Sequence, residues 1–243
     1  ILSSSFKVKF IGLSATPGRA SSNSIENKQL SRLFSNNLIT SGILGSDPIK
    51  ELQGREILAP IKRTSLYTEV DVDLDMNEIG ETIINRRSLT RLSTNKARNE
   101  QIVKVVEEQV KQGNKVIVFS CTVGHARTLS ILLAKNGLVA CAVDCEMSSE
   151  ARKLAVMSFK KNEVQVLLNY GVFSTGLDVP DIGAVVITRP TTSIVLYSQM
   201  IGRGMRGKFV GGTNQCTIID ILDNVCEYGE VNDVYNYFES YWE

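Results

Sequence analysis

Short apolar runs alternate with stretches of helical spacing along the second half of the chain. Segments 124–137, 148–161 and 192–204 have the spacing of amphipathic helices, and the runs KVIVFS, LVACAV, VQVLLN, IGAVVI and QCTIIDIL predict strands. Ser148 is expected to cap the second helix, and Gly137 stands where a left-handed residue would end the first. A further helix is expected after the last strand. Such an order predicts an α/β fold in which helices cover both faces of a parallel sheet, with ligands at the carboxyl ends of the strands.

The first 60 residues follow a different pattern. KVKFIGLSA, residues 7–15, predicts a strand that leads into a Pro-Gly turn and polar helices, and Asp47 and Pro48 predict a helix cap and the first helical residue. We therefore assign residues 1–62 to the end of one domain and residues 63–243 to a second domain. The second domain is entered through the extended stretch RTSLYTEVDVDLD, and residues 76–94 have no clear pattern. The chain starts in mid-strand without Met, so we expect it to be part of a longer protein.

The amino-acid composition argues against several classes of protein and of catalytic site. No apolar run approaches the roughly 20 residues that a membrane span needs, and the amino terminus lacks a signal-peptide pattern. We expect no membrane contact and a protein that is not secreted but cytoplasmic, of bacterial or phage type, or bound to nucleic acid. The five cysteines and the single histidine favour buried thiols over a zinc site or disulfides, and they argue against a Ser-His-Asp or Cys-His hydrolase.

The net charge of +1 is unevenly distributed. No Lys or Arg follows Lys208, whereas seven Asp or Glu residues do. A basic body is compatible with a phosphate-rich partner, and a solvated surface is the alternative.

One stretch, MIGRGMRGKF, carries most of a phosphate-binding P-loop, because Gly202 to Lys208 reads Gly-x-x-x-x-Gly-Lys. A P-loop follows a strand and has Ser or Thr after its lysine, where it helps to hold magnesium. Here the run follows a predicted helix, and Phe209 follows the lysine. The stretch instead reads Gln-x-x-Gly-Arg-x-x-Arg, with Arg203 and Arg206 three residues apart at a helix end, so both guanidinium groups can point the same way.

Gln-x-x-Gly-Arg-x-x-Arg resembles motif VI of superfamily 2 helicases and translocases, and three other motifs of that family occur in order. GLSATPGR (12–19) resembles motif III, with Ser14, Ala15 and Thr16 as the residues that couple hydrolysis to strand movement. Its Pro-Gly-Arg extension is typical of the restriction-enzyme-like or DNA-repair-like branch. KVIVFSCTVGHARTL (115–129) resembles motif IV, and NYGVFSTGLDVPDIGAVV (169–186) resembles motif V. The helix between them matches the family at Arg152 and Phe159, of which Phe159 is expected in the core.

The resemblance implies a RecA-like fold of the P-loop NTPase type, with the second motor domain at 63–243 and the end of the first, with motif III, at 1–62. Such motors hold ATP and Mg2+ between two domains, mainly by first-domain motifs that this chain lacks, so alone it should not hydrolyse ATP. Arg206, assisted by Arg203, would be the catalytic arginine finger that reaches the γ-phosphate from the second domain. The nucleotide side would be shaped by Gln199, Gly202, Gly176 and Asp178.

Nucleic acid, and DNA in particular, is the partner that the resemblance implies, beside the first RecA-like domain. Contacts are expected from Ser120, Cys121, Thr122 and Thr175, although the hydroxyl groups at 120 and 122 could equally be helix caps. RNA-helicase relatives carry a backbone-contacting Thr where Tyr170 stands here, so that role is not transferred. The surrounding Gly-Val-x-x-x-Gly form resembles the DNA-acting branch.

Other interpretations remain open. The chain could be a silent nucleic-acid-binding or scaffolding module with a helicase-like fold, or a self-contained phosphotransferase that uses Gly202 to Lys208. Asp71, Asp73 and Asp75 share one face of an extended stretch, which favours a solvated face over a metal site, and no metal site is predicted. A basic cluster could contact nucleic acid or be simple surface charge, and its members are Arg86, Arg87, Arg91, Lys96 and Arg98.

Overall fold

The computed structural model describes residues 10–14, 17–18, 24–39, 45, 47–76, 82–172, 178–223 and 242. The helices are α1 (Ser24–Leu33), α2 (Pro48–Gly54), α3 (Arg86–Thr94), α4 (Lys96–Lys111), α5 (Val123–Lys135), α6 (Ser149–Lys160) and α7 (Ile194–Ile201), with the 3-10 helix η3 at Lys208–Val210. The strands are β1 (Ile61–Tyr67), β2 (Leu74–Met76), β3 (Thr82–Ile84), β4 (Lys115–Phe119), β5 (Ala140–Asp144), β6 (Val166–Tyr170), β7 (Ile182–Ile187) and β8 (Cys216–Leu222).

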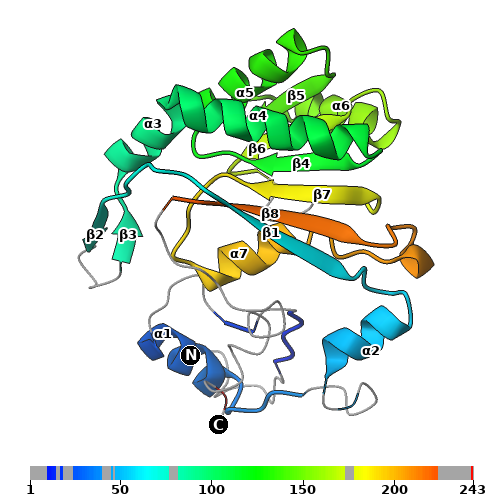
Figure 1. Ribbon diagram of the computed structural model, residues 1–243. Helices are drawn as coiled ribbons and strands as arrows, with labels where there is room; N and C mark the ends of the chain where they lie inside the picture. The colour runs from blue at the N-terminus through cyan, green and yellow to red at the C-terminus, as the bar shows by residue number, and fades with distance from the viewer. Residues whose placement is uncertain are drawn as a thin grey trace.

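Six strands form one parallel sheet in the order β1-β8-β7-β4-β6-β5, and β2 pairs with β3 in a separate antiparallel ribbon. Figure 1 shows the carboxyl ends of the strands directed toward α3 and the β2–β3 ribbon, and their amino ends toward α2. Because all six strands run the same way, residues that follow them meet at one edge of the sheet. The predicted parallel α/β fold is confirmed.

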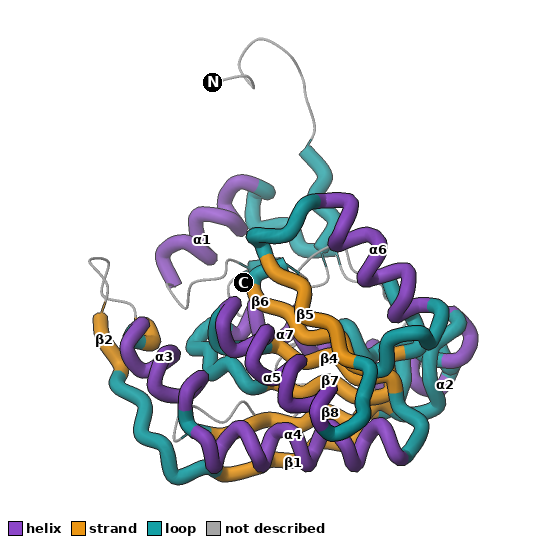
Figure 2. Tube along the Cα trace, turned by 90° about the horizontal axis from the view of Figure 1, so that it is seen from above, coloured by secondary structure: helices purple, strands orange, loops and turns teal. Residues whose placement is uncertain are grey.

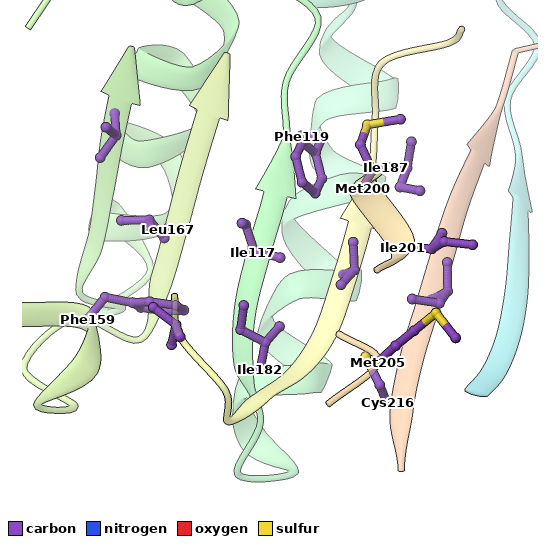
Figure 3. Packing of buried hydrophobic residues seen from close by; sticks show 14 of the residues in the cluster. Ile117, Phe119, Phe159, Leu167, Ile182, Ile187, Met200, Ile201, Met205 and Cys216 are labelled. Carbon is purple, nitrogen blue, oxygen red and sulfur yellow. The ribbon is translucent and has the colours of Figure 1, made fainter. Parts of the chain in front are cut away.

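Helices cover both faces of the sheet, which makes three layers (Figure 2). On one face, β4, β6 and β7 pack against α4 and α5 through residues such as Ile102, Val106 and Leu129. On the other face, alternate residues of the same strands pack against Phe159 of α6 and against Met200 and Ile201 of α7 (Figure 3). Burial on both faces explains why the central strands read as nearly continuous apolar runs.

Local capping signals fix the helices that the sequence predicts. Side-chain oxygens of Thr122, Ser148 and Ser193 accept backbone N–H bonds at the starts of α5, α6 and α7. Gly137 has φ +85°, a left-handed conformation that a β-carbon would strain, and it directly follows the end of α5. The Asp47 carboxylate accepts from the Lys50 amide at the start of α2, as predicted.

Three features of the fold differ from the sequence pattern or extend it, and one expected helix lies outside the described residues. Residues 10–14, part of the predicted strand, form none, and Ile11 and Leu13 are exposed there. The β2–β3 ribbon and α3 lie largely in the stretch without a clear pattern, and α4 was not anticipated either. Strand β1 begins at Ile61, two residues before the domain boundary we placed, whose assignment stays a prediction. The expected helix after β8 lies outside the described residues.

Among the helices of the described ranges, none has both the length and the apolar character that a membrane crossing requires.

Candidate nucleotide and nucleic-acid site

The residues singled out by the motifs separate onto two opposite edges of the sheet. Asp178 precedes β7 and Arg206 precedes β8, so both lie at the amino edge, whereas Ser120 and Thr122 follow β4 at the carboxyl edge. Thr175, Gly176, Ala15 and Thr16 lie outside the described residues. The candidate site therefore has a nucleotide edge and a nucleic-acid edge, joined through the strands.

The two arginines of the motif VI segment are held apart by a buried anchor. Met205 is 3% exposed and lies in the core beside Cys216 (Figure 3). A β-carbon at Gly204 would stand 2.2 Å from the Cys216 sulfur and 2.9 Å from a Val185 methyl carbon, so only glycine fits without displacement. Gly204 and Met205 thus press the chain onto the sheet, while Arg203 and Arg206 on either side remain partly exposed.

The Gly202–Lys208 run is not shaped as a phosphate cradle. It follows α7 rather than a strand, and the Gly202 and Gly204 amides donate to carbonyls of the helix end. The Gly207 amide donates to the Ile57 carbonyl at 2.9 Å, and a β-carbon there would lie 2.1 Å from the Glu56 carbonyl oxygen. Because these amides are engaged within the protein and Gly207 serves close backbone packing, the run offers no nest of free donors such as a P-loop provides.

Arg206 and Asp178 link motif VI to motif V at the nucleotide edge. The Arg206 Nη1 donates to Asp178 Oδ1 at 2.5 Å, and their side chains are 39% and 72% exposed. Lys160, at the end of α6, adds a longer contact of 3.8 Å between its Nζ and Asp178 Oδ2. The Arg206 hydrogen bond and the two positive charges hold the pKa of the Asp178 carboxyl below its ordinary value. Asp178 of motif V therefore contacts an arginine of motif VI.

The other residues expected on the nucleotide side surround α7. Gln199 lies in the last turns of this helix and Gly202 caps it, and both are half-buried, as is Arg203. The helix itself is fixed on the sheet by Tyr197, whose hydroxyl donates to Asp220 Oδ2 at 2.8 Å. Arg63 of β1 donates to the same carboxylate oxygen at 2.7 Å. This contact ties the motif VI helix to β1 and β8, a connection that no local sequence signal revealed.

At the carboxyl edge, the motif IV loop is more deeply buried than its sequence suggested. Ser120 is 1% exposed and Cys121 is fully buried, so their side chains lie beneath the surface. Burial raises the pKa of the Cys121 thiol to about 11, and the protonated thiol donates to the Thr188 carbonyl. Thr122 is half-buried and caps α5 through a 3.0 Å bond from the His125 amide. The helix-cap alternative thus holds for Thr122.

His125 stabilises the motif IV loop through hydrogen bonds of its imidazole ring, a role that its position at the start of α5 did not reveal. Its Nδ1 accepts the Cys121 amide at 3.2 Å, which leaves Nε2 to donate to Asn99 Oδ1 at 3.0 Å. Both ring nitrogens are therefore engaged by the neutral imidazole. Desolvation by burial, followed by the positive charge of Arg98, lowers the pKa of His125 to about 3.

Arg98 lies at the centre of this buried network, so its assignment to a surface cluster was wrong. Its Nε and Nη2 each donate to an Asp223 carboxylate oxygen at 2.7 Å, and both side chains are fully buried. Nη2 also donates to the Thr188 carbonyl at 2.5 Å. The pair joins α4 to the carboxyl ends of β7 and β8, directly behind the motif IV loop.

The aspartates of the EVDVDLD stretch contact neighbouring polar groups. Asp73 accepts from Ser88 and pairs with Arg91 at 3.2 Å, and Asp75 accepts from Asn85 at 2.7 Å. Within the described part of the chain, no group of three or more His, Cys, Asp or Glu side chains is arranged to hold a metal ion.

The motif III segment is described in part. Ser14 is exposed, and farther along the segment the Pro17 carbonyl accepts a hydrogen bond from the Trp242 indole at 2.9 Å. The Trp242 ring also lies 6.2 Å from that of Phe34, measured between centroids. Residues from the two ends of the chain are therefore in contact at this point.

Comparisons with known proteins agree with the fold. Residues 97–208 match the model of the helicase conserved C-terminal domain. The chain is 30% identical over 220 residues to the Saccharomyces cerevisiae protein named "Putative ATP-dependent helicase IRC3", an alignment that covers 89% of this chain and 30% of the relative. It is also 30% identical to the "ATP-dependent rRNA helicase RRP3" of Mycosarcoma maydis, over 61% of this chain and 26% of that protein.

Among solved structures, the fold is similar to "The fragment structure of a putative HsdR subunit of a type I restriction enzyme from Vibrio vulnificus YJ016". The TM-score is 0.58 at 22% identity, with 82% of this chain and 38% of that one covered. The chain spans less than a third of the length of either sequence relative. Residues 97–208, which lie within the RecA-like parallel sheet, thus match the conserved C-terminal domain of helicases.

Proposed function

We propose that this chain is the C-terminal half of an ATP-dependent helicase or translocase, in which Arg206 is the arginine finger. The observation that carries the proposal is the weak hold on Arg206. Its partner is one largely exposed carboxylate, and exposed ion pairs contribute little net stability because solvent screens them. The guanidinium can therefore exchange Asp178 for a phosphate at little cost, unlike Arg98, which is locked in a buried pair.

The residues around Arg206 fit a phosphate-facing surface. Arg203 would assist it, while Gln199, Gly202 and Asp178, with Gly176 outside the described residues, would shape the nucleotide side. Two cationic donors suit the triphosphate of ATP, which supplies the reactive phosphoanhydride when bound. Mg2+ would be held mainly by the first motor domain and by ATP, because the described residues offer no acidic cluster for it. An arginine finger of this kind contributes roughly 10³- to 10⁵-fold in rate.

DNA is the substrate that we propose for the nucleic-acid edge. Support comes from the Gly-Val-x-x-x-Gly form of motif V and from the Pro-Gly-Arg extension of motif III, both typical of the DNA-acting branch. Ser120, Cys121, Thr122 and Thr175 would contact the strand. The side chains of Ser120 and Cys121 are buried and their amides donate within the protein, so contact by these two requires the loop to open. Ser14, Ala15 and Thr16 would couple hydrolysis to movement along the strand. The motor would act in DNA repair or restriction.

Arg206→Ala in the full-length protein tests the finger. We expect ATPase activity stimulated by single-stranded DNA to fall by roughly 10³-fold or more, while ATP binding, followed with a fluorescent ATP analogue, persists. Arg206→Lys should restore little, because lysine lacks the planar fork of donors. Lys208→Ala is the matched control, since Lys208 is exposed and close by in sequence, and it should keep nearly full turnover.

Three results would contradict the proposal. Unchanged turnover in Arg206→Ala would exclude the finger. Loss of turnover in Lys208→Ala alone would favour a self-contained phosphotransferase. Absence of ATPase activity in the wild-type protein, with DNA binding intact, would favour the silent nucleic-acid-binding module.

A further inference from the structure

Tyr170 ends strand β6 at the nucleic-acid edge, beside the motif IV loop. In the sheet register Asn169 pairs with Phe119 of β4, so Ser120 is the neighbour of Tyr170 on that side, and Asp144 of β5 pairs with it on the other. The Ser120 amide donates to the Asn169 carbonyl at 2.8 Å, which fixes the two strand ends together. Gly171, with φ +71°, then turns the chain away from the edge. The tyrosine is half-buried and is held by rigid elements on both sides.

Arg189 reaches this ring from the opposite side of the motif IV loop. It follows β7, where the buried Thr188 donates through its amide to the Phe119 carbonyl at 3.0 Å. The guanidinium carbon of Arg189 lies 5.2 Å from the centroid of the Tyr170 ring, within the range of a cation–π contact. Because β4 lies between β7 and β6, the pair spans the carboxyl end of β4.

Arg189 differs from most other arginines of the described residues in its ion pairing. Among the described residues, no carboxylate forms an ion pair with it, whereas Arg63, Arg91, Arg98, Arg127 and Arg206 each have one. The guanidinium is half-buried and lies against an aromatic ring. A planar cation that lies on an aromatic ring and pairs with no carboxylate of the described residues is suited to a ligand that is both flat and anionic.

We propose that Tyr170 and Arg189 form a stacking platform for one base of a single strand of nucleic acid. This deepens the proposed function and rests on it. Bases stack on aromatic rings and on guanidinium planes whatever their identity, so the platform would hold unpaired bases of any sequence. It would place one base against the platform while the adjacent backbone passes the motif IV loop. Tyr170 thereby has a role different from the backbone contact of the Thr in RNA-helicase relatives.

Binding of fluorescein-labelled oligodeoxythymidylate to the full-length protein, followed by anisotropy, tests the platform. Tyr170→Ala should weaken binding roughly 5- to 150-fold, the range that corresponds to loss of one base–aromatic stack. Tyr170→Phe keeps the ring and should bind within about twofold of wild type. Thermal unfolding of both variants controls for a packing defect, because the half-buried ring is replaced in one and kept in the other.

A strand with one abasic position, moved along the oligonucleotide, separates stacking from other contacts. In the wild type, an abasic site at one position should weaken binding as much as Tyr170→Ala does. In Tyr170→Ala, an abasic site at the same position should weaken binding no further. If the abasic strands weaken both proteins equally, or neither, the platform is excluded while DNA binding by the motor stands. If the wild type binds no strand, the proposed function and the platform both fail. Arg189→Lys and Arg189→Ala should weaken binding to the same extent. Full binding by the lysine variant would show a phosphate contact instead of stacking.

Discussion

At the scale of single residues, the packing of Gly204 and Met205 sets the spacing of the two motif VI arginines. Gly204 lies against Cys216 and Val185, and Met205 enters the core, so the chain between the arginines cannot lift from the sheet. Gly204, the second glycine of Gly-Arg-Gly-Met-Arg, is thus required for packing and not for phosphate binding. The sequence showed that glycine was present but could not show what lay against it.

Gly204→Ala should lower the free energy of unfolding by about 1–3 kcal/mol, because the new methyl group overlaps the Cys216 sulfur and a Val185 methyl carbon. Urea unfolding followed by circular dichroism measures the change. Gly54→Ala is the matched control, since nothing lies within 4 Å of a β-carbon at that helix position. A double-mutant cycle with Cys216→Ala should show favourable coupling, and strict additivity would contradict the overlap.

His125 makes stability depend on pH in a window that can be named. Its pKa is about 3 in the folded protein and about 6.5 when unfolded, so between these values the unfolded chain binds the extra proton. Stability is therefore full above about pH 6.5 and is lost as the pH falls toward 3. Lowering the pH from 7 to 5 should cost about 2 kcal/mol from this group alone.

His125→Gln removes the titration and keeps a hydrogen-bonding side chain. We expect the variant to be less stable than wild type at pH 7 but to lose much less on acidification to pH 5. If the free energy of unfolding falls equally with pH in the two proteins, His125 is not buried in its neutral form.

At the scale of elements, one ion pair joins α4 to the ends of β7 and β8. Removing either partner of the Arg98–Asp223 pair leaves a buried charge without compensation, so Arg98→Ala should cost about 3–5 kcal/mol in chemical unfolding. Arg91→Ala breaks an exposed pair with Asp73 and should cost less than about 1 kcal/mol. Similar costs for the two variants would contradict the buried role of Arg98.

The elements that sequence could predict are those whose signals are local. Helices α5, α6 and α7 carry their caps within four residues, β7 is an uninterrupted apolar run, and β8 is mostly apolar. The assignment of Arg98 to the surface failed because its partner is 125 residues away along the chain. Ile11 and Leu13 have the composition of a strand but find no partner strand among the described residues. Pairing between distant segments decides such cases, and it leaves no local pattern.

At the scale of the whole molecule, the candidate site is divided between two edges of one sheet. The motifs predicted the candidate residues, whereas their separation follows from the common direction of the strands, because Arg206 lies before β8 and Ser120 follows β4. The buried supports of those residues, Met205, His125 and Arg98, came to light only in the structure. A rigid sheet between the edges would transmit movement from the nucleotide edge to a bound strand of nucleic acid.

The isolated 243-residue chain should bind single-stranded DNA weakly and should not hydrolyse ATP, because its P-loop-like run has its amides engaged internally. A coupled phosphate-release assay at saturating DNA measures this, with the full-length protein as the positive control. Turnover by the isolated chain that Lys208→Ala abolishes would reverse this conclusion.

The contact between Trp242 and Pro17 gives the molecule a built-in optical probe. Trp242 is the single tryptophan of the 243-residue chain, and its indole lies on the motif III segment and near Phe34. Indole emission depends on polarity and hydrogen bonding, so a shift of the segment away from the ring would change both its wavelength and its intensity. Intrinsic fluorescence can thus follow movement of the motif III segment in real time, without a label.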